Sequence, residues 1–220
     1  GEDGIVYMKN NAIFSEYLHE EDQKEIVEGW LSLGDHGYLD ELGHLHILDR
    51  QEDVITNTDG EIIYPRLVEN ELKSSPYIQE AVCFGKDKPY VTAILNIDMS
   101  SVGRWADKNR ILYTEYSDLS RNPKVVELIE QQVEQLMSKL SPQNRVKKFS
   151  ILHKQFTADQ GELTRTLKIR RNFVEQKYKI LLDGMYSDTQ EVSLTSSQTE
   201  SVEEEVSLRV IQLKIEQGVA

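Results

Sequence analysis

The pattern of apolar residues changes near residue 50, and this change constrains the fold more than any other feature of the chain. Before it, short apolar runs separated by turn residues predict strands. These strands cover residues 5–8, 30–33, 37–39 and 44–48. The last two should form a hairpin about the turn at 40–43, and the charged segment 15–29 predicts a surface helix or loop. Residues 1–49 therefore indicate a small β-rich subdomain.

After residue 50, β patterns alternate with helical ones, which predicts a mixed α/β domain. Pro65 suits the first turn of a helix, where an amide hydrogen has no partner, and that helix should end near 74–76. Asn122 before Pro123 is typical of a helix start. This second helix carries an apolar stripe of Val125, Val126, Ile129, Val133, Leu136, Met137 and Leu140. Strands are predicted at 54–55, 62–63, 78–85, 90–97 and 149–152, and a closing helix at 172–182.

The C-terminal tail is acidic, but its flanks alternate in the manner of strands. Apolar residues at 192 and 194, and again at 206, 208 and 210, are separated by polar ones. This predicts a two-stranded hairpin with a loose acidic loop. Because two strands alone are only marginally stable, the hairpin should pack on the domain. The fold class predicted for the whole chain is α+β, with the β-hairpin at its C-terminal end.

Composition limits the partners of this chain. Its 220 residues carry a net charge of −13, which argues against nucleic acid because the phosphates would meet a repelling field. One basic cluster, Arg165, Lys168, Arg170 and Arg171, suits a nucleotide phosphate. The single cysteine, Cys83, lies in an apolar run, which predicts a buried strand residue and fits a reducing cytoplasm. No run is long and apolar enough for a membrane helix, and no signal peptide is indicated.

Three polar residues are candidates for chemistry, although each alone has an ordinary explanation. Asp35 follows Gly34 and could be a simple turn residue. Arg50 should lie at the exposed end of a strand, where its fork of donors reaches a ribose oxygen, a phosphate or a surface carboxylate. Lys168 lies at a predicted strand end between threonines and arginines, and a charge run is usually a solvated face.

Together, the stretch GWLSLGDHGYLDELGHLHILDRQEDVITNTDGEIIYP at 29–65 and the segment GELTRTLKIRR at 161–171 resemble the C-terminal part of the adenylate-forming acyl-CoA synthetases, especially the long-chain fatty acid ligases. The Leu-Thr-x-Thr-x-Lys pattern of that branch ends at Lys168. Leu167 stands where other branches have glycine, and Leu33 stands where the family usually has threonine. The resemblance implies four parts. They are the closing β subdomain of a large N-terminal domain (1–49), a hinge (50–53), a mobile C-terminal lid (54–186) and an acidic loop with a hairpin tail (187–220).

The resemblance also implies roles for site residues. Asp35 would clamp the ribose of ATP, Arg50 would bind the same nucleotide, and Lys168 would be the catalytic lysine. Glu52 would be the hinge, with Asp53 as the alternative. The turn at Gly60 and Glu61 would face the pantetheine arm of coenzyme A. Those roles imply a fatty acid CoA ligase that uses ATP, Mg²⁺ and coenzyme A, and that forms an acyl-adenylate before the thioester.

The family's phosphate-cradling loop and acyl pocket do not occur in this sequence. We therefore expect a piece of a longer protein, inactive without its N-terminal domain. Gly1 opens directly into a strand pattern, which agrees with this. Two alternatives stay open: an acyl-carrier-protein synthetase of the same fold, and a non-enzymatic interaction module. Histidines 36, 44 and 46 are expected to be solvated or hydrogen-bonded rather than metal ligands, because no cysteine or acidic cluster completes a site. Chain-length specificity, oligomeric state and a peripheral membrane contact stay open too.

Overall fold

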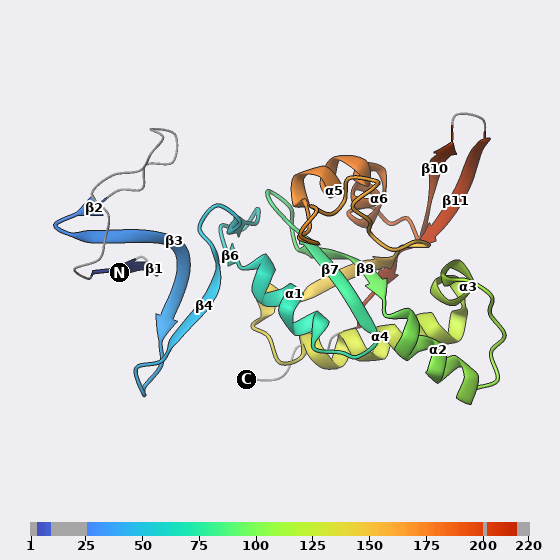
Figure 1. Ribbon diagram of the computed structural model, residues 1–220, viewed down its shortest axis with the longest axis horizontal. Coiled ribbons are helices and arrows are strands. Elements are labelled where there is room, and N and C mark those ends of the chain that lie inside the picture. The colour runs from blue at the N-terminus through green and yellow to red at the C-terminus, as the bar shows by residue number, and fades with distance from the viewer. Residues whose placement is uncertain (1–3, 10–25, 200–201, 215–220) are drawn as a thin grey trace.

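The computed structural model describes residues 4–9, 26–199 and 202–214, which form a β subdomain followed by an α/β domain (Figure 1). The α+β class predicted from the sequence is confirmed. Most of the segment predicted as a surface helix or loop, 15–29, lies outside the described residues. Ile26–Val27, within that segment, form a short strand instead. Within the described part, no helix is long and apolar enough to cross a membrane.

The β subdomain is a sheet built around one long strand. β3 (Trp30–Leu39) pairs antiparallel with β1 (Ile5–Met8), β2 (Ile26–Val27) and β4 (Leu45–Arg50). The prediction of separate strands at 30–33 and 37–39 was therefore wrong. Gly34 has a φ of 71°, a conformation that glycine adopts without strain, so the strand bends there and continues. The predicted hairpin about 40–43 is confirmed by the pairing of β3 with β4.

The α/β domain is organised around a second sheet with the strand order β12-β9-β8-β7. The predicted strands at 78–85 and 90–97 are confirmed as β7 (Ile78–Phe84) and β8 (Val91–Ile97), which pair antiparallel, whereas β8 and β9 (Val146–Ile151) are parallel. A small ribbon of β5 (Ile55–Thr56) and β6 (Ile62–Ile63) precedes the sheet and confirms the predicted strand pair there.

Helices supply the connection that the parallel pair requires. Between β8 and β9 lie α2 (Met99–Lys108), α3 (Tyr116–Arg121), α4 (Pro123–Met137) and a short 3₁₀ turn, Pro142–Asn144. The predicted cap of α4 is present, since the Asn122 side chain accepts a hydrogen bond from the amide of Lys124 at 3.0 Å. The sequence interpretation had left the segment of α2 and α3 without elements.

The two faces of the main sheet bury two separate apolar clusters. One cluster packs below α1 (Pro65–Lys73) and α2 to α4, and it includes the predicted stripe of α4 and Cys83, which is 1% exposed. The other lies under α5 (Arg171–Lys177), α6 (Lys179–Met185) and the C-terminal hairpin (Figure 1). The single closing helix predicted at 172–182 is thus two helices. They divide at Tyr178, whose hydroxyl donates to Glu162 at 2.8 Å.

The hairpin tail is confirmed as β10 (Glu191–Thr199) and β11 (Val202–Arg209). Its apolar residues, Val192, Leu194, Val206 and Leu208, are buried in the second cluster, so the hairpin packs on the domain as expected. Pairing continues as far as Thr199 with Val202, so the strands take up most of the predicted acidic loop, and residues 200–201 lie outside the described part. β12 (Ile211–Gln212), which was not predicted, then joins the main sheet beside β9.

Candidate functional site

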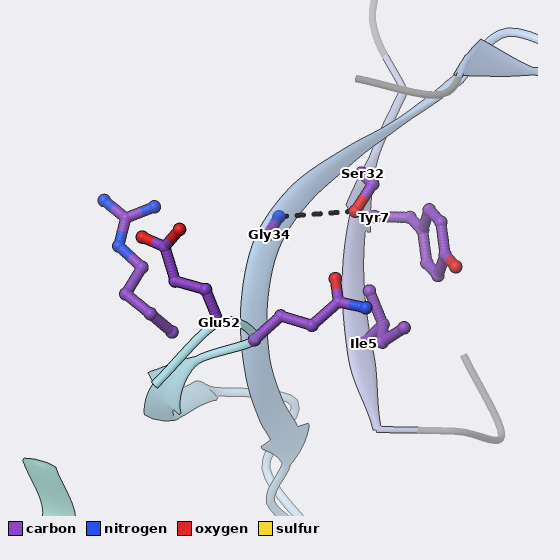
Figure 2. Close-up of a pocket in the computed structure, with 7 residues that line it drawn as sticks. Ile5, Tyr7, Ser32, Gly34 and Glu52 are labelled. Carbon is purple, nitrogen blue, oxygen red and sulfur yellow. Dashed lines mark hydrogen bonds between the residues drawn. The ribbon is translucent and has the colours of Figure 1, made fainter. Parts of the chain in front are cut away.

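A pocket of about 570 Å³ opens between β1, β3 and the turn that follows β4 (Figure 2). Its lining consists of Ile5, Tyr7, Ser32, Gly34, Arg50, Gln51 and Glu52. The aromatic ring of Tyr7, the backbone groups and the guanidinium of Arg50 suit a nucleotide more than a purely apolar ligand. This pocket brings the sequence-predicted residues Arg50 and Glu52 to one place.

Asp35 lies beside this pocket and is paired with Arg50. The two residues are opposite each other in the β3–β4 ladder, and Nε of Arg50 is 3.2 Å from Oδ1 of Asp35. The Asp35 side chain is 19% exposed and that of Arg50 is 48% exposed. Within the described part of the chain, no hydrogen bond reaches Oδ2 of Asp35. The pair therefore presents an acceptor and the free donors of a guanidinium on the same edge.

The predicted hinge residues form a tight turn between the two parts of the chain. The amides of Asp53 and Val54 both donate to the carbonyl of Arg50 at 3.1 Å, and the amide of Gln51 donates to the carbonyl of Gly34 at 2.8 Å. Glu52 lines the pocket, whereas Asp53 lies on the side of Arg171, with Oδ1 3.9 Å from Nε. Two adjacent carboxylates thus face different neighbours.

Asp49, to which the sequence interpretation gave no role of its own, is fully buried at the junction of the two domains. Its carboxylate accepts the amide of Arg50 at 2.8 Å and the amide of Arg66, in the first turn of α1, at 2.6 Å. Burial raises the pKa of Asp49, against the effect of these hydrogen bonds. An acidic residue is favourable at a helix N-terminus. Sequence reasoning missed this role of Asp49 because the helix that it contacts, α1, begins on the other side of the hinge.

The turn at Gly60 and Glu61 is organised by Asn57. The Asn57 side-chain oxygen accepts the amides of Asp59 and Glu61, at 3.0 and 2.8 Å, and its nitrogen donates to the Glu61 carboxylate at 2.9 Å. Gly60 has a φ of 80°, and the space where a Cβ would project is open. Glycine is therefore required here by the backbone conformation, and the open face is free to meet a ligand.

Lys168 lies on a hydrogen-bonded turn, so the prediction of a strand end was wrong. Thr164 organises this turn: its amide donates to the carbonyl of Lys168 at 2.8 Å, and its hydroxyl accepts the amide of Lys168 at 3.0 Å. Leu167 has a φ of 60° and is 71% exposed. The Lys168 side chain is exposed, and no ion pair within the described ranges involves its amine. Lys168 does not line the pocket beside Asp35 in this conformation.

His44 and His46 are exposed and lie within hydrogen-bond distance of Asp40, as predicted for solvated or hydrogen-bonded side chains. His36 lies against Tyr64, with ring centroids 6.0 Å apart. Nδ1 of His44 and Nε2 of His46 both lie near Oδ2 of Asp40, at 3.1 and 3.0 Å. These contacts, with that of His46 largest, lower the pKa of Asp40 to about 2. Across the described residues, no group of three or more His, Cys, Asp or Glu side chains could hold a metal ion.

Comparison with known proteins shows which family has this arrangement. The family model described as the AMP-binding enzyme C-terminal domain matches residues 52–190. The chain belongs to this family. The resemblance to adenylate-forming acyl-CoA synthetases is thereby confirmed. The matched residues contain β7, β8 and β9 of the main sheet and helices α1 to α6, whereas β12 follows the matched range.

Curated relatives of this AMP-binding enzyme domain are fatty acid ligases. The chain is 31% identical to long-chain-fatty-acid–CoA ligase FadD15 of Mycobacterium tuberculosis over 84% of this chain and 32% of the relative. It is 29% identical to long-chain-fatty-acid–CoA ligase ACSBG2 of Gallus gallus over 90% of this chain and 29% of the relative. The chain therefore spans about a third of the length of the curated relatives that it matches.

Solved structures of similar fold are adenylate-forming enzymes. The adenylation domain of a carboxylate reductase from Mycobacterium chelonae superposes with a TM-score of 0.56 at 21% identity, covering 73% of this chain and 23% of that one. The amide bond synthetase McbA from Marinactinospora thermotolerans gives a TM-score of 0.52 at 21% identity, covering 79% of this chain and 30% of that one. At these identities the likeness supports the fold alone.

Proposed function

We propose that this chain supplies the ribose clamp, hinge and catalytic lysine of an ATP-dependent fatty acid CoA ligase. Residues 1–49 would be the closing β subdomain, 50–53 the hinge, 54–186 the mobile lid and 187–220 the tail. One observation carries the proposal: an exposed lysine, with no ion-pair partner among the described residues, is presented on a hydrogen-bonded turn across a polar hinge from the Asp35–Arg50 pair. The names of the curated relatives support fatty acid as the substrate class.

In the first half-reaction, the fatty acid carboxylate attacks the α-phosphorus of ATP, and pyrophosphate leaves with the electrons of the broken P–O bond. Asp35 would accept hydrogen bonds from the ribose hydroxyls, and Arg50 would donate to a ribose oxygen or a phosphate. Lys168 would lie between the carboxylate and the α-phosphate, where a compact cation stabilises the developing charge. Most of the rate enhancement in such chemistry comes from position and charge.

In the second half-reaction, the thiol of coenzyme A attacks the acyl carbon and AMP leaves. Rotation about Glu52 or Asp53 would withdraw Lys168 and bring the Gly60–Glu61 turn to the pantetheine arm. The open face of Gly60 suits this close approach. Magnesium would accompany ATP and be held mainly by the phosphates, with protein ligands outside this chain. A lone buried cysteine suits the reducing cytoplasm that we propose for the enzyme.

An ATP–pyrophosphate exchange assay tests this proposal. Exchange would be measured with fatty acids of short to long chain, for the 220-residue chain and for the full-length parent protein. We expect exchange by the parent and none by the chain alone, because the chain corresponds to only about a third of the length of its curated relatives. Robust exchange by the chain alone, or no exchange by the parent with any fatty acid, would contradict the proposal. Thioester formation with free coenzyme A, compared with a carrier protein's pantetheine, then identifies the acceptor.

A further inference from the structure

Arg171 begins α5, three residues after Lys168, and its guanidinium is firmly held. Nη1 donates to Oε1 of Glu69 at 2.6 Å and to the carbonyl of Cys83 at 2.7 Å, and Nη2 donates to Oε2 of Glu69 at 3.0 Å. Two parallel bonds from a planar fork to one carboxylate fix orientation as well as distance. Arg171 therefore links the start of α5, which directly follows the lysine turn, to α1 and to β7.

Glu69 is equally well placed to serve as the anchor. Its side chain is 10% exposed, and Oε1 also accepts the amide of Cys83 at 2.7 Å. Burial raises the pKa of Glu69, and the charge of Arg171 opposes that effect. The Glu69–Arg171 pair thus binds both backbone groups of Cys83, a buried residue of β7. Glu69 belongs to α1, whose first turn contacts Asp49 through the amide of Arg66. The Glu69–Arg171 pair therefore lies on the helix next to the hinge.

One nitrogen of Arg171 is not used in this conformation. Nε is buried and has no hydrogen-bond partner among the described residues. The carboxylate of Asp53 is 3.9 Å away, beyond hydrogen-bond distance, and it is 40% exposed on the hinge turn. A buried donor without an acceptor is unfavourable. A modest rearrangement of the turn at 50–53 would bring this carboxylate onto Nε.

We infer that Arg171 is a positioning residue with two functions. Through Glu69 it fixes the lysine turn on the domain core, and through Nε it binds Asp53 in the hinge orientation that serves adenylation. The hinge orientation is thereby coupled to the position of Lys168, although neither Arg171 nor Glu69 contacts a substrate. This inference rests on the proposed function for the role of Lys168, whereas the ion pair itself stands on the contacts above.

Half-reaction kinetics on the full-length parent test the first function. Arg171→Lys keeps the charge and removes the fork, so we expect kcat/KM of adenylation to fall about 10- to 100-fold from misplacement of Lys168. Thioester formation from preformed acyl-adenylate should stay within about threefold. The double variant Glu69→Met/Arg171→Met removes both buried charges, so it avoids an unpaired carboxylate and should show the same split. Arg104→Lys, on the exposed face of α2, is the control and should change neither half-reaction. Equal loss in both, or no loss, would overturn the inference.

Nuclear magnetic resonance of the 220-residue chain tests the second function without reference to activity. The Nε–Hε signal of Arg171 would be followed in the unsubstituted chain, in Asp53→Asn and in Asp59→Asn, an exposed control on the neighbouring turn. We expect Asp53→Asn alone to move this signal and to speed its solvent exchange. An unchanged signal would overturn the contact with Asp53. A parent inactive toward fatty acids would count against the proposed function but not against the ion pair. Hydrogen exchange of the Lys168 amide in Arg171→Lys would still test whether the Glu69–Arg171 pair holds the lysine turn. Faster exchange would support that role, and unchanged exchange would overturn it.

Discussion

Asp35 and Arg50 face each other across β3 and β4, with Nε of Arg50 3.2 Å from Oδ1 of Asp35. Because the Arg50 side chain is about half exposed, such a pair contributes only about 0 to 1 kcal/mol to folding. Its geometric effect is larger, since it holds the guanidinium at the rim of the pocket and the carboxylate beside it. Ligand binding and stability can therefore be separated by substitution at this pair.

Asp35→Ala in the full-length parent should weaken ATP binding at least about 10-fold, because two ribose hydroxyls lose their acceptor. The thermal midpoint should shift little. Binding would be measured by calorimetry with ATP, and stability by thermal unfolding. Glu41→Ala, in the exposed turn of the same hairpin, is the matched control and should leave both unchanged. Unaltered ATP affinity in Asp35→Ala would refute the ribose-clamp role.

Lys168→Ala in the full-length parent should abolish adenylation, with a loss of at least about 100-fold, because the transition-state charge loses its cation. Thioester formation from preformed acyl-adenylate should be largely retained, since the proposed role of Lys168 is confined to the first step. Single-turnover assays of each half-reaction measure the two separately. Arg165→Ala tests whether removal of another positive charge from the same turn has the same effect on adenylation as removal of Lys168. If Lys168→Ala impaired both half-reactions equally, the assigned role would be wrong.

Leu167→Gly should stabilise the 220-residue chain by about 0.5 to 1 kcal/mol. The left-handed conformation costs a non-glycine residue about 1–2 kcal/mol. Glycine avoids this cost, but its greater conformational freedom in the unfolded chain offsets part of the stabilisation. The exposed leucine side chain offers little burial to offset the strain. Urea unfolding measures the change. Thr166→Gly, in the same turn but without a positive φ, should be neutral or destabilising.

His153 should make the chain sensitive to acid. Both ring nitrogens are buried and have no hydrogen-bond partner within the described ranges. Burial, aided by Lys154 and Arg121 and opposed by Glu162, lowers the pKa of His153 from 6.5 to about 4. Between these values the unfolded chain binds a proton that the folded chain does not. Stability is therefore full above about pH 6.5 and falls as pH decreases toward 4, by on the order of 2 kcal/mol.

His153→Leu should remove this part of the pH dependence. Unfolding free energies of both chains would be measured between about pH 7.5 and about pH 4, a range that brackets the shift in the pKa of His153. The difference between the chains should grow in favour of His153→Leu as pH falls. Parallel curves would show that His153 does not titrate in this window.

Gly184→Ala should loosen the C-terminal hairpin. A Cβ at residue 184 would lie 2.4 Å from Cγ2 of Val192, so β10 or α6 must move. Overpacking of this kind costs about 1–3 kcal/mol, which outweighs the gain of about 1 kcal/mol from replacing a helical glycine. Thermal unfolding should show net destabilisation. Adding Val192→Ala should restore part of the loss, and Lys179→Ala, exposed on α6, should be close to neutral.

Local chemistry made much of the fold predictable. The start of α1 at Pro65, the cap of α4 at Asn122 and the β3–β4 hairpin depend on residues a few positions apart, so the sequence carries them directly. The alternation at 192–194 and 206–208 likewise specified the tail hairpin. The resemblance around Asp35 and Lys168 identified the family, which the match over residues 52–190 confirms. The roles of these two residues stay predictions.

Tertiary structure decided the rest, because the deciding contacts join residues far apart in the chain. The closing helix divides at Tyr178, which binds Glu162 from the preceding loop, and β12 pairs with β9, which lies far from it along the chain. The bent β3 is continuous because its partners continue alongside it. Arg171 reads in sequence as one cation among several, yet it pairs with Glu69, 102 residues away. Local preference cannot specify such a contact, since it acts only along the chain.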